Sequence, residues 1–163
     1  MIMPTLAARA RSDMTQKPAY LAPDCPLTLA EGLEAFAAAN PGLLPPGDGE
    51  LREFIRAHDA CHVLFGLGTT VEDEAVADTW TIFGSDVGLR RYASYLGRPE
   101  IAGIIQQIGW WNLTAGSARA LPRVLRAIVR ARRMSAPWPF FDYARSLDVP
   151  IAALRRRYNV RPV

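Results

Sequence analysis

Lysine, cysteine and histidine are all scarce in this chain of 163 residues. Lys17 is the only lysine, so arginine carries almost all of the positive charge. The two cysteines, Cys25 and Cys61, form no Cys-x-x-Cys pair and suggest no disulfide framework, which fits a reducing compartment. The only histidines are His58 and His62, so any imidazole chemistry is confined to one short stretch.

Other missing features exclude whole classes of protein. No apolar run approaches the roughly 20 residues that a transmembrane helix needs. Residues 1–21 lack an apolar block followed by a cleavage site, so we expect no secretory signal. The sequence also shows no alternating strand pattern, no internal repeat and no flavin or nicotinamide motif. These absences favour a cytoplasmic protein built from helices.

Helix signals run through most of the chain after residue 26. Residues 1–26 are rich in Pro, Ala and Ser and lack periodicity, which predicts a flexible arm before one helical domain at 27–163. The capping pattern from Thr28 to Glu31 opens the first helix. Helices are expected near 29–39, 50–65, 71–84, 89–96, 99–111, 114–134, 140–146 and 150–158. The sequence therefore predicts an all-α, single-domain bundle of about seven or eight helices.

The two histidines are four residues apart and lie on one face of the helix expected at 50–65. That face also carries Leu51, Phe54, Ile55 and Phe65, so it is expected to point inward. Buried imidazoles need polar partners, because an unpaired polar group in a core costs roughly 1–3 kcal/mol. A shared cation completed by carboxylates would satisfy both rings. The ordinary alternative is a pair of core histidines bonded to backbone carbonyls or acids.

Three acids are placed to complete such a site. The loop at 66–69 is short, which predicts that the helices on either side form an antiparallel hairpin. Glu74 then lies opposite the histidines, Asp78 lies one turn behind Glu74, and Asp59 lies at the rim. Imidazole and carboxylate ligands suit Zn²⁺ or Fe²⁺, and carboxylate-rich sites can hold Mn²⁺ or Mg²⁺. The spacing makes a metal-binding helix hairpin possible.

His58, Asp59, His62 and Glu74 together spell His-Asp-x-x-His-x11-Glu. This motif resembles the signature of the ubiquinone (coenzyme Q) biosynthesis proteins of the fourth complementation class. The arginine-rich helix at 114–134 and the ending from Val149 to Val160 also look like that family. The resemblance covers roughly Leu51 to Val160.

The resemblance implies a fold, a cofactor and a reaction. It implies an all-helical, homodimeric, membrane-associated protein that binds a divalent cation, often zinc. The implied reaction is an oxidative decarboxylation of a polyprenylated hydroxybenzoate, in which a hydroxyl replaces the ring carboxylate. By position, His58, Asp59, His62 and Glu74 would take the metal roles, with Asp59 and Glu74 also catalytic. Because no redox-cofactor motif is present, oxygen or another protein must accept the electrons.

A row of basic residues lies in the C-terminal part of the chain. Its arginines align on one face of the helix expected at 114–134: Arg119, Arg123, Arg126, Arg130 and Arg133. Leu121, Val124, Leu125 and Ile128 occupy the other side. The arginine face is either simply solvated or contacts anionic lipid head groups or a phosphate on a prenyl ligand. Without interleaved aromatics or a reading motif, nucleic acid is not an expected partner.

Other interpretations of the histidine motif fit less well. A metalloprotease of the His-Glu-x-x-His type needs a longer acid at the position of Asp59. An HD-type phosphohydrolase needs a histidine upstream of His58, which this chain lacks. The serious alternative is a non-catalytic, lipid-binding scaffold that organises quinone-biosynthesis enzymes at the inner membrane, on its matrix side in a mitochondrion.

Overall fold

The computed structural model describes residues 17–42, 49–98 and 110–163, which contain helices and no β-strand. The α-helices are α2 (Leu29–Ala39), α3 (Glu50–Phe65), α4 (Val71–Gly84), α5 (Gly88–Leu96), α7 (Trp110–Ala131) and α8 (Ile151–Arg157), and the 3-10 helices are η1 (Ala19–Leu21) and η2 (Tyr143–Ser146). The all-α prediction is confirmed. The six described α-helices are fewer than the seven or eight expected.

The differences in helix number have identifiable causes. The helix predicted over 140–146 is reduced to the short 3-10 helix η2. Of the helix predicted over 99–111, residues 99–109 lie outside the described residues, and Trp110 and Trp111 belong to α7. The described part of the long basic helix already includes residues 110–113, ahead of Thr114, where the helix was expected to begin. Among the described residues, no helix combines the length and apolar character that crossing a bilayer requires.

Local side-chain signals fix the ends of the helices. At α2, Thr28 Oγ1 accepts from the Glu31 amide (3.2 Å) and Glu31 Oε2 accepts from the Thr28 amide (2.8 Å), which completes a capping box. At α4, Thr70 Oγ1 accepts from the Asp73 amide at 3.1 Å. Helix α3 ends at Gly66 with φ 70°, a left-handed conformation that glycine adopts without steric cost. These caps place α3 and α4 where the sequence predicted them.

Helices α3 and α4 form the predicted antiparallel hairpin. His58 pairs with Asp78 and His62 pairs with Glu74, so residue numbers rise along one helix as they fall along the other. The aromatic rings of Phe65 and Trp80 stack between the helices with centroids 4.4 Å apart. The hairpin therefore places the histidines of α3 opposite the acids of α4.

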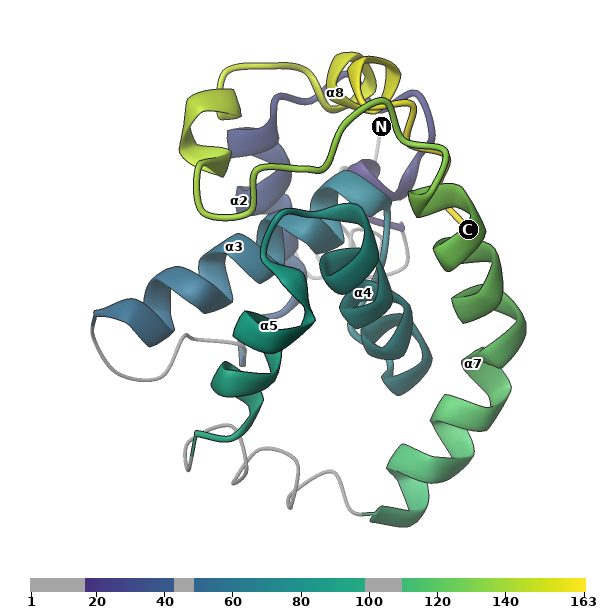
Figure 1. Ribbon diagram of the computed structural model, residues 1–163. Helices are drawn as coiled ribbons and strands as arrows, with labels where there is room; N and C mark the ends of the chain where they lie inside the picture. Colours follow the sequence, from purple (N-terminus) through teal and green to yellow (C-terminus); the bar gives the residue numbers. More distant parts are fainter. Residues whose placement is uncertain (1–16, 43–48, 99–109) are drawn as a thin grey trace, which may run out of the picture.

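Helix α7 runs beside α4 and parallel to it (Figure 1). Arg123 contacts Asp73 at the start of α4, and Met134 lies against Gly84 at its end. Where the burial of α7 is described, from residue 118 onward, its buried side chains are small ones: Ala120, Ala127 and Ala131, with 1 %, 0 % and 6 % exposed. Small residues let the two helix backbones approach closely.

The apolar side of α7 is only partly buried. Of the apolar residues opposite the arginines, Val124 and Ile128 are partly buried. Leu121 and Leu125 instead face solvent, with 54 % and 55 % exposed, as does Val129 with 47 %. The alanines take the contact with α4, so the larger residues are turned outward.

Arg155 connects α8 to the end of α3 and to the segment before α2. Its side chain is 3 % exposed. The guanidinium donates to five backbone carbonyls, those of Tyr20, Ala22, Pro23, Val63 and Leu64. An arginine has five N–H donors, so its hydrogen-bonding capacity is filled. The carbonyls of Val63 and Leu64 belong to the last turn of α3, where a cation is electrostatically favourable.

The same contacts hold residues 17–26 of the expected arm against the helices. Tyr20 and Cys25 are buried, with 1 % and 0 % exposed. The amides of Ile151 and Ala152 donate to the carbonyls of Leu27 and Cys25 at 2.8 and 3.1 Å. This segment therefore packs on α8 and belongs to the domain.

We expect Arg155→Lys to destabilise the fold by about 2 kcal/mol or more, because lysine offers three donors to five buried carbonyls. Urea unfolding followed by circular dichroism measures the change. The matched control is Arg156→Lys at the exposed neighbouring position, where a change within about 0.5 kcal/mol is expected. Equal stability of the two variants would show that the five hydrogen bonds contribute little.

Candidate metal centre

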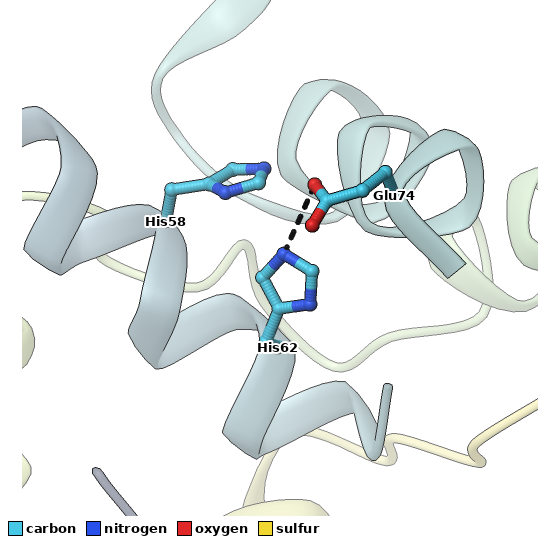
Figure 2. Close-up of side chains that lie close together, drawn as sticks. All are labelled: His58, His62 and Glu74. Carbon is cyan, nitrogen blue, oxygen red and sulfur yellow. Dashed lines mark ion pairs between the residues drawn. The ribbon is translucent and has the colours of Figure 1, made fainter. Parts of the chain in front are cut away.

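His58, His62 and Glu74 converge on one small space between α3 and α4 (Figure 2). The histidines lie on successive turns of α3, with ring centroids 4.8 Å apart. Glu74 lies in the first turn of α4. One ligand atom from each of the three residues lies within 4.8 Å of the others, a spacing that a single ion could bridge.

The position of the proton on His62 follows from its contacts. The ring is almost fully buried, with 1 % exposed. Its Nδ1 lies 2.8 Å from the carbonyl oxygen of Gly68, which can only accept, so Nδ1 carries a proton. In the neutral ring the lone pair is then on Nε2. This nitrogen faces Oε2 of Glu74 at 3.4 Å.

A lone pair and an ionised carboxylate do not attract one another. The contact between His62 and Glu74 therefore needs either a second proton on the ring or a cation shared by the two groups. His58 lies beside this contact and adds a second imidazole. Three ligands of this kind are typical of a divalent metal centre with one position open for water or substrate.

His58 is oriented by an acid on the next helix. Its Nε2 lies 3.2 Å from Oδ1 of Asp78, and its ring lies parallel to that of Phe54, with 14° between the planes. Burial disfavours the charged imidazole, but the hydrogen bond and the charge of Asp78 outweigh burial and raise the pKa of His58. Burial alone would raise the pKa of Asp78, but the hydrogen bonds from His58 and Tyr92 and the charges of the two histidines together lower it.

Asp59 lies near the centre but outside the group of three. Its carboxylate is not among the ligand atoms that come within 4.8 Å of one another. Burial raises the pKa of Asp59 to about 6, against the opposing charges of His58 and His62. A carboxyl group with this pKa can exchange a proton near neutral pH, which suits a proton acceptor better than a permanent ligand.

The centre is closed on the histidine side and open on the carboxylate side. The side chains of His62 and His58 are 1 % and 15 % exposed, whereas those of Glu74 and Asp78 are 39 % and 41 % exposed. An ion or substrate could therefore reach the imidazoles past the acids.

No protein-family model, curated protein or solved structure matches this chain. Any proposal of a function therefore rests on the residues of the motif and on their geometry in the described part of the chain.

The predicted arginines lie apart from the three ligands but shape the charge around Glu74. Arg123 pairs with Asp73 at 2.7 Å, and Arg119 approaches Glu72 at 3.9 Å. Arg130 donates to the backbone carbonyls of Arg161 and Pro162, and Arg126 is exposed. Two of the three successive acids at the start of α4 are thus paired with α7, while Glu74 turns to the histidines.

Sequence reasoning missed two groups that orient the histidines. The Gly68 carbonyl is a backbone atom in a loop whose glycines indicated only the end of a helix. The hydroxyl of Tyr92, in α5, donates to Oδ1 of Asp78. No spacing rule connects a tyrosine to an acid in the preceding helix, so the sequence carried no signal for this contact.

We expect neither cysteine to react with iodoacetamide in the folded protein at pH 8. Cys25 and Cys61 are both 0 % exposed, and burial raises the pKa of the Cys61 thiol to about 12, so its reactive thiolate is almost absent. Mass spectrometry should find no adduct before unfolding and two after unfolding in urea. Labelling of Cys61 in the folded protein would instead indicate a thiolate close to the metal centre.

Proposed function

We propose that this protein binds one divalent ion through His58, His62 and Glu74 and acts in quinone biosynthesis. The proposed reaction replaces the ring carboxylate of a polyprenylated hydroxybenzoate by a hydroxyl. The proposal of a metal ion rests on the contact between Nε2 of His62 and the Glu74 carboxylate, with His58 beside it. The proposed class of substrate rests on the resemblance of the motif to that of the coenzyme Q proteins.

Zinc is the ion that fits this ligand set best. Two imidazole nitrogens and one carboxylate oxygen are ligands that Zn²⁺ commonly takes, and Fe²⁺ accepts the same types. Mn²⁺ and Mg²⁺ prefer more oxygen ligands than these three residues provide. When bound, such an ion supplies a Lewis acid for a ring carboxylate or phenolate.

The residues of the chain have distinct roles in this proposal. His58 and His62 bind the ion from the buried side, and Glu74 binds it from the open side. Asp59, with its pKa near neutral, accepts the proton of the ring hydroxyl. Loss of carbon dioxide and gain of a hydroxyl is a two-electron oxidation of the ring, so oxygen or a partner protein must accept the electrons.

Elemental analysis of the purified protein tests the metal directly. We expect about one zinc per chain, and we expect Glu74→Gln to lower the bound metal at least tenfold, because an amide binds Zn²⁺ far more weakly than a carboxylate. The matched control is Glu72→Gln, two residues earlier in the same turn, which should retain the metal. Mass spectrometry of lipid that co-purifies identifies the prenylated ligand. Wild-type protein without metal after incubation with Zn²⁺ would refute the proposal.

The same variant separates an enzyme from a scaffold. In an enzyme, Glu74→Gln should fold and bind membranes while conversion of the prenylated hydroxybenzoate stops. In a scaffold, quinone production should continue as long as the complex with other quinone-biosynthesis enzymes assembles.

The scaffold remains the second candidate because of the outer face of α7. Leu121, Leu125 and Val129 are spaced four residues apart and about half exposed, and Arg126 lies exposed beside them. An apolar strip next to arginine suits the boundary of an anionic membrane. We propose peripheral binding to the inner membrane through this face, in a homodimer.

Binding to lipid vesicles tests this face. We expect Leu125→Glu to weaken binding to mixed phosphatidylcholine and phosphatidylglycerol vesicles by about tenfold or more, because it removes an apolar side chain and adds a negative charge. Flotation of the vesicles measures the bound fraction. Leu89→Glu is the control, since Leu89 is 64 % exposed on another helix, α5. If both variants bind as the wild type does, this face does not contact the membrane.

A further inference from the structure

Tyr92 brings a third helix, α5, to the back of the metal centre. Its side chain is 3 % exposed, and its hydroxyl donates to Oδ1 of Asp78. The same oxygen lies 3.2 Å from Nε2 of His58. One carboxylate oxygen therefore receives a hydrogen bond from a tyrosine and from a histidine.

These contacts determine which nitrogen of His58 has the lone pair. A carboxylate only accepts hydrogen bonds, so Oδ1 of Asp78 accepts both from the Tyr92 hydroxyl and from Nε2 of His58. Nε2 of neutral His58 must then be the donor to Asp78. The lone pair of that ring is on Nδ1.

Aromatic packing holds the tyrosine in place. The rings of Tyr92 and Phe54 have centroids 5.5 Å apart, and those of Tyr92 and His58 are 6.2 Å apart. Phe54 in turn stacks on His58. With both neighbours fixed, the hydroxyl cannot leave Asp78 without disturbing this cluster.

We infer that Tyr92 is a positioning residue that acts through Asp78 to keep the proton of His58 on Nε2, so that His58 binds the divalent ion through Nδ1. The inference rests on the proposed metal function and adds a residue outside the motif. His62 is fixed in the opposite way, because the Gly68 carbonyl keeps its proton on Nδ1. The two histidines would thus bind one ion through different nitrogens, Nδ1 of His58 and Nε2 of His62.

Histidine ¹⁵N NMR tests this pattern without any substitution, because the chain has only two histidines. In wild-type protein without metal, at a pH where both rings are neutral, His58 should carry its proton on Nε2 and His62 on Nδ1. After Zn²⁺ is added, the shifts should place the metal on Nδ1 of His58 and on Nε2 of His62. Metal on Nε2 of His58 would overturn the inference.

A pair of tyrosine variants tests the role of the hydroxyl. We expect Tyr92→Phe to weaken Zn²⁺ binding about 10- to 100-fold, the range for loss of an outer partner of a metal ligand, because it releases Asp78, which orients His58. It should also mix the two proton positions of His58. The control is Tyr95→Phe in the same helix, whose ring stacks on Phe54 with centroids 4.1 Å apart. This control should bind Zn²⁺ within about threefold of the wild type.

The outcomes separate this inference from the metal proposal. If wild-type protein binds Zn²⁺ and Tyr92→Phe matches the Tyr95→Phe control in affinity and in the His58 shifts, Tyr92 has no positioning role and the metal proposal stands. If wild-type protein binds no Zn²⁺, the metal proposal fails and the inference fails with it. If Tyr92→Phe does not fold, Asp78→Asn replaces it, and unchanged affinity and His58 shifts in that variant would equally overturn the inference.

Discussion

The hydrogen bonds of the buried Arg155 guanidinium are the interaction on which the candidate metal centre depends. The guanidinium binds the carbonyls at the end of α3 and those of the segment from Tyr20 to Pro23. It also lies against Gly66, where a Cβ atom would come within 3.2 Å of its Nη2. The end of α3 and the turn into the next loop are therefore fixed together. That loop places the Gly68 carbonyl, which sets the proton position on His62.

The basic C-terminal part of the chain acts on the site through charge. Helix α4 begins with Glu72, Asp73 and Glu74, and carboxylates are favourable at a helix N-terminus. Arg119 and Arg123 of α7 pair with the first two, which reduces the negative charge around the third. Surface ion pairs of this kind contribute little to stability. Their effect is on orientation, because they hold the neighbouring acids toward α7 and leave Glu74 to the histidines.

Local signals in the sequence were sufficient to predict the hairpin of α3 and α4, but not the contacts that other helices make with it. Caps at Thr70 and Gly66 fix α3 and α4, and the motif spacing then brings His58, His62 and Glu74 together. The contacts of Arg155 and Tyr92 join residues from separate helices, and they depend on packing that no local pattern encodes. The face of α7 that packs on α4 could not be predicted for a related reason. Periodicity identifies an apolar side of a helix, but it cannot tell that alanines, rather than leucines, would meet α4.

The ordinary alternative, two core histidines held by hydrogen bonds alone, accounts for only one of the two nitrogens in each ring. The Gly68 carbonyl satisfies Nδ1 of His62, and Asp78 satisfies Nε2 of His58. Each ring then has one nitrogen left, and for His62 that nitrogen faces the carboxylate of Glu74. In a purely structural pair, His62 would need a second proton, on Nε2, to pair with Glu74, and this would place a charged ring in a nearly buried site. A divalent ion shared by the imidazoles and the carboxylate removes this conflict, and the same arrangement leaves an open side for a substrate.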